Sequence, residues 1–298
     1  MTHLKNQGES KKLRYVEELE YRYLKTLDEA IKSNLNYIIE RFKSRFQIYE
    51  YWIRYFKSET SKKRLTDLGV GAERVFWKII SSMFADWQPI PIYIGSNLFL
   101  ETQDAFINID IKTVYVDNLR DYAGLVEVGE AQTSYPMKKT YGASQQFQPK
   151  ISMYYEVKGI IKYSLAFFIQ IIYEKPEIIV EKKLDEGPIA LILISMPNGL
   201  LYEVYGDNIV GYPKSYRSKE IKDGRRLRER PANYRYFYSK SPCYKLLHDY
   251  PCNYRLRIYF NSKYNGYHRE GLDEKVTIRN ILNLCSSCND RDCYITTF

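Results

Sequence analysis

The sequence predicts an α/β fold with a helical N-terminal region. Between residues 13 and 56, apolar side chains recur at spacings of three and four, which is typical of amphipathic helices. Two uninterrupted apolar runs, 164–173 and 188–196, are typical of buried strands. Between these patterns lies the segment 104–113, in which Ala, Ile, Ile and Ile alternate with other residues at the period of two that a strand requires.

Composition sets the limits for domain number and partners. The chain has 298 residues, of which 45% are hydrophobic, so it can form one large core, with or without an arm. A net charge of +9 combined with 30 tyrosines favours a polyanion as partner. No signal-peptide pattern and no apolar run of roughly 20 residues is seen, so we expect a cytoplasmic protein with no membrane segment.

The helical pattern at the N-terminus follows a polar segment, residues 1–12, that we expect to be frayed. The helices that follow have a possible break near Ser33 and Asn34. Their apolar stripe must be buried, either on the core or on a second copy of the chain. We therefore divide the chain into a helical arm or dimerisation region, 1–66, and a main domain, 67–298.

A second helix and a hairpin precede the central strand. The helix is expected over 71–84, with Glu73 near its first turn. The segment 87–100 then becomes a short strand, and turn residues follow at 101–104. A turn centred at residues 102 and 103 puts Asp110 across from about Gly95, with Asn97 as a near neighbour on the same face.

The central strand carries the residues with the clearest chemical potential. Asp110 and Lys112 are two positions apart, so they share a face at a spacing of about 7 Å. A carboxylate that can bind a metal, next to an ammonium that can handle a proton, is an arrangement found in nucleases. The same pair is also an ordinary ion pair of a solvated sheet face.

The rest of the chain adds a polar segment, a basic segment and a cysteine-rich tail. A strand-like pattern over 125–131 leads into the polar stretch 132–146. Residues 212–240 hold ten Lys or Arg against three acids, with tyrosines interleaved, which favours a loop that contacts phosphates. A further strand is expected at 255–260. A zinc site is a weaker possibility, with the ligands Cys285, Cys288 and Cys293 and a fourth donor from Cys243, Cys252 or His248.

Three short motifs in this order carry a family resemblance: residues 108–113 (NIDIKT), 131–134 (AQTS) and 196–199 (MPNG). Together with the preceding helix, the segment 67–200 resembles the PD-(D/E)xK nuclease core, in particular type II restriction endonucleases of the EcoRV and BglI kind. The resemblance implies a mixed central β-sheet flanked by helices. It also implies Mg²⁺-dependent cleavage of double-stranded DNA into 5′-phosphate and 3′-hydroxyl ends, a homodimer, and a cognate DNA methyltransferase as partner in the cell.

The resemblance also implies roles for individual residues. Asp110 would be the second motif acid and Lys112 the motif lysine, with the Ile111 carbonyl facing the metal and Glu73 as an auxiliary acid. The chain departs from the family at the first motif acid, where Asn97 stands in place of an aspartate. There are two explanations. Asn97 is the natural residue and Glu73 supplies the missing negative charge, or Asn97 results from replacement of an acid by its amide, which would give an inactive form. Other acids that could fill this role are Asp104, Glu101 and Asp86.

DNA reading is expected of side chains that can offer two hydrogen bonds to a base edge, and of nearby cations. The candidates are Gln132, Thr133, Ser134, Tyr135, Lys138, Gln145, Gln146, Lys214, Arg217, Arg225 and Arg226. Two other functions remain open from the sequence. One is another nuclease with the same core, such as a resolvase or repair enzyme, and the other is a basic nucleic-acid-binding protein without catalytic activity.

Overall fold

The computed structural model describes residues 2–47, 68–91, 95–138, 147–211, 233–240, 255–270, 275–277 and 295–298. The N-terminal region is helical, as predicted: α1 spans Thr2–Ser33 and α2 spans Leu35–Ser44, with the break at Asn34. The expectation of a frayed start is wrong, because α1 already begins at Thr2. None of the helices in the described ranges is long and apolar enough to span a membrane.

The centre of the molecule is a mixed sheet with strand order β1-β2-β3-β6-β7-β10-β11, in which β5 also pairs with β6. The pairs β3–β6 and β10–β11 are parallel, and the others are antiparallel. The strands are β1 Gln88–Pro89, β2 Leu98–Glu101, β3 Ala105–Tyr115, β5 Tyr154–Val157, β6 Ile160–Tyr173, β7 Ala190–Met196, β10 Leu256–Phe260 and β11 Ile295–Thr297. The predicted mixed sheet is therefore confirmed.

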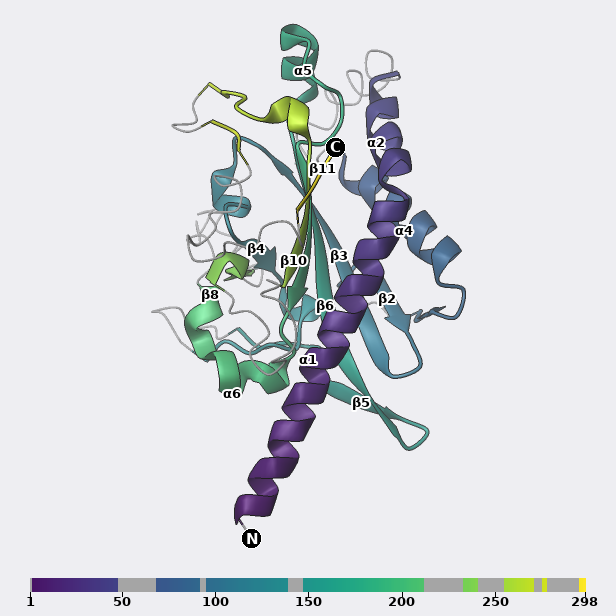
Figure 1. Ribbon diagram of the computed structural model, residues 1–298, viewed down its shortest axis with the longest axis vertical. Coiled ribbons are helices and arrows are strands. Elements are labelled where there is room, and N and C mark those ends of the chain that lie inside the picture. The colour runs from purple at the N-terminus through teal and green to yellow at the C-terminus, as the bar shows by residue number, and fades with distance from the viewer. Residues whose placement is uncertain are drawn as a thin grey trace, which may run out of the picture.

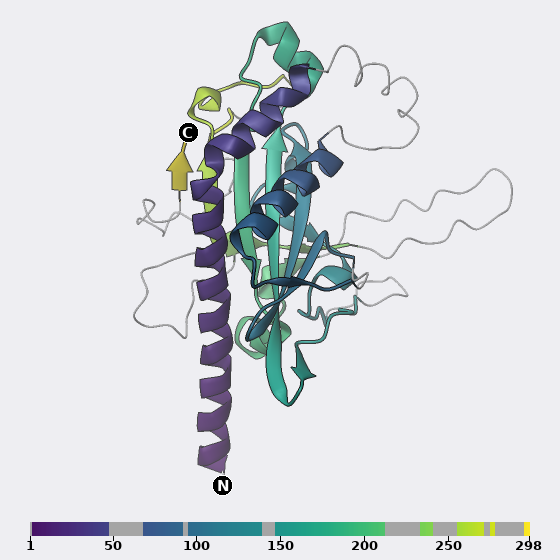
Figure 2. The same ribbon diagram turned by 90° about the vertical axis from the view of Figure 1, so that its right-hand side faces the viewer.

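Different elements cover the two faces of this sheet (Figures 1 and 2). Helices α1, α2 and α4, the last spanning Gly69–Met83, lie on one face. On the other face lies a small antiparallel sheet of order β4-β9-β8, formed by Val126–Val128, Tyr234–Tyr236 and Val210–Gly211. Two short helices complete the fold, α5 at Pro176–Lys182 and α6 at Tyr202–Tyr205.

The connection between β3 and β6 determines what covers the second face. Parallel neighbours need a long crossover, and residues 116–159 provide it. Part of this crossover is β4 and the 3₁₀ turn η4, Glu130–Gln132. A segment distant in sequence is thereby brought to the face on which the even-numbered side chains of β3 lie.

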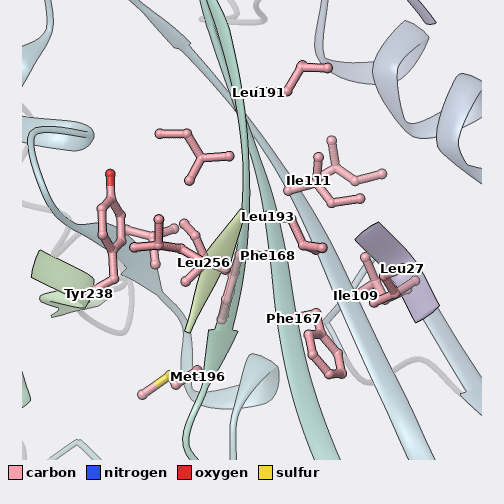
Figure 3. Packing of buried hydrophobic residues seen from close by; sticks show 14 of the residues in the cluster. Leu27, Ile109, Ile111, Phe167, Phe168, Leu191, Leu193, Met196, Tyr238 and Leu256 are labelled. Carbon is pink, nitrogen blue, oxygen red and sulfur yellow. The ribbon is translucent and has the colours of Figure 1, made fainter. Parts of the chain in front are cut away.

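The central strand is more buried than its alternating sequence suggests. Figure 3 shows Ile109 beside Leu27 of α1, on the helix-covered face. The intervening positions of β3 point the other way, and they too are buried from Ala105 to Ile111. Alternation of this kind is typical of a strand that is buried on one face only, but here the crossover covers the polar face as well.

The β2–β3 hairpin has a register two residues away from the predicted one. Leu98 pairs with Ile109 and Glu101 with Phe106, so the turn is centred one residue later than expected. One step beyond the end of this ladder lies Asn97, which therefore stands opposite Asp110, where Gly95 was expected. A shift by an even number of residues leaves every side chain on its predicted face.

A buried ionic cluster attaches α1 to the sheet. The Arg255 guanidinium, fully buried, contacts Glu20 Oε2 and lies 3.1 Å from Glu17 Oε1, both on α1. The Tyr205 hydroxyl donates to Glu17, and the backbone N–H of Asn198 donates to Glu20 at 2.6 Å. Burial raises the pKa of Glu20, and Arg255 offsets this in part. The N-terminal helix is thus part of the core.

Replacing Arg255 by methionine is expected to destabilise the fold by about 3–5 kcal/mol, because two carboxylates then stay buried without a cation. The free energy of unfolding in denaturant measures this loss. Arg14→Met is the matched control, since Arg14 and Glu18 form a half-exposed pair at 3.4 Å on the same helix. That variant should cost less than about 1 kcal/mol. Equal losses in the two variants would contradict the role given to the buried cluster.

Candidate active site

Asp110 and Lys112 form an ion pair on the polar face of β3. The Lys112 ammonium lies 2.6 Å from Asp110 Oδ2. The Asp110 side chain is 7% exposed and that of Lys112 is 23% exposed, so the pair is reached from solvent at its lysine end. Burial raises the pKa of Asp110, and the Lys112 charge and hydrogen bonds from Lys112 and Gln132 counteract this shift in part. The carboxylate is thus held next to a positive charge in a poorly hydrated site.

Asn97 is brought to this pair by the hairpin. Its Oδ1 accepts a hydrogen bond of 2.6 Å from the Ile111 backbone N–H. Because the N–H and C=O of one residue point to the same side of a strand, the Ile111 carbonyl also faces the Asn97 side. The β2 ladder ends at Leu98, so it supplies no backbone partner there. Asp110, Asn97 and Ile111 therefore bring three oxygen-bearing groups to neighbouring positions at the end of the hairpin.

Gln132 was predicted to read a base edge, but its side chain contacts both members of the ion pair. Its Nε2 donates to Asp110 Oδ1 at 2.9 Å and to the Gly95 carbonyl at 3.2 Å. Its Oε1 accepts from Lys112 Nζ at 3.1 Å and from the Gly129 N–H at 2.8 Å. The side chain faces the ion pair, so the prediction that Gln132 reads a base edge has no support in this structure.

Two further residues of this site were missed by sequence reasoning. Asn108 Nδ2 donates to the Gln132 carbonyl at 3.0 Å, next to the pair on the same face of β3. Gly95 has φ +85°, and a Cβ there would lie 2.7 Å from the Ala131 side chain. The alternation of the strand could have indicated Asn108. No local sequence pattern indicates that position 95 must lack a side chain so that Ala131 can pack against it.

The residues after Gln132 are directed into the protein. Thr133, Ser134 and Tyr135 are 1%, 3% and 0% exposed. The Ser134 hydroxyl accepts from the Gly199 N–H at 3.1 Å, and the Tyr135 hydroxyl donates to the Gly206 carbonyl at 2.6 Å. In these positions they reach no base edge, so their predicted role in DNA reading also has no support here.

Lys138 differs from these residues because it is exposed. Its ammonium lies 4.4 Å from the centre of the Tyr202 ring, a distance typical of a cation–π contact. The other predicted DNA contacts lie outside the described residues, as do the cysteines of the possible zinc site. These are Gln145, Gln146, Lys214, Arg217, Arg225, Arg226, Cys285, Cys288 and Cys293, together with the alternative fourth zinc donors Cys243, Cys252 and His248.

The alternative first acids lie elsewhere. Asp104 forms an ion pair with Arg22 of α1. Glu101 lies 2.6 Å from the Lys162 ammonium. Asp86 is exposed in the turn after α4. In this arrangement Asn97 is the residue opposite Asp110.

Glu73 is not brought to the pair either. It is half-buried on α4, which lies on the helix-covered face of the sheet (Figure 2). Among the described residues it makes no hydrogen bond or ion pair with Asp110, Lys112 or Asn97. The auxiliary role implied by the family resemblance therefore stays a prediction.

The oxygen groups at this site suit a hard cation such as Mg²⁺, which they would bind weakly. A carboxylate, a side-chain amide oxygen and a backbone carbonyl are the oxygen ligands that Mg²⁺ accepts. Asp110 already faces a positive charge, the Lys112 ammonium, which shows that its carboxylate is presented to cations. Within the described ranges no group of three or more His, Cys, Asp or Glu is placed so that it could hold a metal ion.

Comparisons with known proteins show what the chain is similar to in sequence family and in fold. No curated protein is similar enough in sequence to count as a relative. In fold, the chain is similar to the restriction endonuclease BglI bound to its DNA recognition sequence, with a TM-score of 0.59 and 19% identity over 85% of this chain and 94% of BglI. It is also similar to the tetrameric restriction endonuclease SfiI bound to cognate DNA, with a TM-score of 0.54 and 12% identity over 88% of each chain.

A family profile decides the relationship. The profile described as "Type II restriction enzyme MwoI, N-terminal domain" matches residues 12–177, more than half of the chain. This range contains most of α1, the β2–β3 hairpin, the Asp110–Lys112 pair and Gln132. The two solved structures share the fold of a restriction endonuclease. The chain therefore belongs to the MwoI family of type II restriction enzymes.

Proposed function

We propose that the protein is a Mg²⁺-dependent type II restriction endonuclease that hydrolyses phosphodiester bonds at a specific sequence of double-stranded DNA. The observation that carries this proposal is the convergence of Asp110, Lys112, Asn97 and the Ile111 carbonyl at the end of one hairpin. The proposal is also supported by the family to which the chain belongs and by two restriction enzymes of the same fold whose structures contain DNA.

The chemistry follows from the charges at this site. Asp110, with Asn97 and the Ile111 carbonyl, would hold Mg²⁺, which when bound lowers the pKa of a water and offsets charge on the phosphoryl oxygens. Lys112 carries its ammonium at the solvent-facing end of the pair, where it can orient the attacking water and neutralise charge on the scissile phosphate. Attack on phosphorus with departure of the 3′ oxygen leaves 5′-phosphate and 3′-hydroxyl ends.

DNA would be held by cations around this site. Lys138 is proposed as one of these cations because it is exposed. Gln145 and Gln146, with Lys214, Arg217, Arg225 and Arg226 of the segment that holds most of the +9 charge, are proposed to contact bases and phosphates. A two-fold homodimer would apply two sites to the two strands of a palindrome. In the cell, a cytoplasmic methyltransferase would protect the host's own sites.

Digestion of a plasmid of known sequence tests the proposal. With purified protein and Mg²⁺ we expect discrete fragments, and sequencing of their termini should give one recognition sequence with 5′-phosphate ends. Chelation of Mg²⁺ by EDTA should abolish cleavage. A smear would instead indicate a nuclease without sequence specificity. Retarded but uncut DNA would indicate a binding protein, and either result would contradict the proposal.

A further inference from the structure

The side-chain amide of Gln132 uses all of its hydrogen-bonding capacity at one place. A primary amide offers two N–H donors and an oxygen with two lone pairs. Here the donors reach Asp110 and the Gly95 carbonyl, and the oxygen receives Lys112 and the Gly129 N–H. We propose that Gln132 is a positioning residue, which fixes the carboxylate and the ammonium of the catalytic pair relative to each other. This inference rests on the proposed nuclease function.

The orientation of the Gln132 amide is set by its surroundings. If the amide were turned by 180°, its oxygen would face the Asp110 carboxylate and the Gly95 carbonyl, and its NH₂ group would face the Lys112 ammonium and the Gly129 N–H. All four contacts would then be repulsive, so a single orientation is favoured. This arrangement gives the pair a rigid partner with no freedom to turn toward a base.

The backbone holds this amide in place. Gln132 is the last residue of η4, where its N–H donates to the Gly129 carbonyl at 3.0 Å. Its own carbonyl receives Asn108 Nδ2 at 3.0 Å. Gln132 thus contacts three successive side chains on one face of β3, at positions 108, 110 and 112. A residue so tied to the strand moves with the catalytic pair.

Lys112 benefits from having two acceptors. Its ammonium lies 2.6 Å from Asp110 Oδ2 and 3.1 Å from Gln132 Oε1. When a second cation shares the Asp110 charge, the attraction between carboxylate and ammonium weakens. The Gln132 oxygen is uncharged and keeps its full acceptor strength. It therefore retains Lys112 at the site while Asp110 is engaged, and the ammonium stays where it can meet a phosphate.

The first test separates the chemical step from DNA binding. With the duplex identified by the plasmid assay, Gln132→Ala is expected to lower the single-turnover cleavage rate about 10- to 100-fold, as loss of an outer partner of a metal ligand does. The affinity for this duplex, measured without divalent cation, and the choice of sequence should stay within about twofold of the wild type, since the Gln132 amide is fully engaged by partners within the protein. A base-reading residue would show the opposite: discrimination between sequences would fall at an unchanged rate.

A second measurement needs no metal and no DNA. In protein labelled with ¹⁵N-lysine, the ammonium signal of Lys112, assigned by its absence in Lys112→Met, should be visible because the group is held by two acceptors. Gln132→Ala should broaden it through faster exchange with water. Gln132→Glu keeps the acceptor oxygen, so this variant should preserve the ammonium signal even though it puts a second carboxylate next to Asp110.

Asn261→Ala is the matched control. Asn261 is a buried amide whose Nδ2 donates to Asp185 Oδ1 at 3.0 Å and to the Pro188 carbonyl at 3.2 Å, with no contact to the catalytic pair. This variant should lose stability but keep the cleavage rate and the Lys112 signal. An unchanged rate and an unchanged signal in Gln132→Ala would overturn the inference while leaving the proposed function intact. Absence of cleavage by the wild-type protein would instead count against the function itself.

Discussion

Cleavage by Lys112→Ala is expected to fall by roughly 100- to 10,000-fold, the range attributed to a positioned group that handles a proton in the transition state. The structure places this ammonium 2.6 Å from Asp110 Oδ2, at the exposed end of the pair. Without it, the attacking water loses an orienting contact and the phosphate loses a neutralising charge. The rate of plasmid cleavage with saturating Mg²⁺ measures the effect.

Two further variants give this experiment its controls. Lys162→Ala removes a buried lysine of the same sheet, which lies 2.6 Å from Glu101 and donates to the Thr102 carbonyl. That variant should keep most of the activity of the folded protein. Lys112→Arg keeps the charge but replaces a compact ammonium by a planar fork, so it should recover little of the lost rate. Near-normal cleavage by Lys112→Ala would show that the pair is structural.

Asn97→Asp is expected to raise cleavage many-fold at limiting Mg²⁺. The new carboxylate keeps the acceptor that receives the Ile111 N–H at 2.6 Å, so the local geometry is retained. It adds a second negative charge opposite Asp110, and the affinity of an oxygen site for a divalent cation depends on the number of charged ligands. The Mg²⁺ concentration that gives half the maximal rate should fall by about tenfold or more.

The control for this prediction is Asn97→Ala, which removes the acceptor of the Ile111 N–H without adding charge and should lower the rate. Two explanations of the amide are thereby tested. A large increase in the cleavage rate of Asn97→Asp would support the explanation that Asn97 has replaced an original aspartate. No change in the rate of that variant would exclude this explanation and would favour a natural asparagine, with the missing charge supplied by another group.

The sequence alone predicts the framework around the site well. The period of two places positions 108, 110 and 112 on one face of β3 whatever covers them. The hairpin register was wrong by two residues, but an even shift leaves Asn97 on the face of Asp110. The helical stripe of α1 also predicted a buried helix, and the structure shows that the sheet of the same chain buries it.

The partners of these residues could not be predicted in the same way. Gln132 is 22 residues from Asp110 along the chain, and a polar residue in a loop reads equally well as a DNA contact. Thr133 and Ser134 follow in the same polar stretch, yet the crossover turns them into the core. Hydrophobic periodicity carries no information about where a loop returns to the sheet.

The sequence by itself determined which side chains of β3 share a face, since strand geometry depends only on the local backbone. Only the tertiary structure decided that this face is largely covered, with the Gln132 amide in contact with both the carboxylate and the ammonium. The reason is the parallel pairing of β3 with β6, which forces residues 116–159 into a crossover and lays η4 on the strand. Contacts between segments so far apart depend on how the whole chain packs, which no local pattern records.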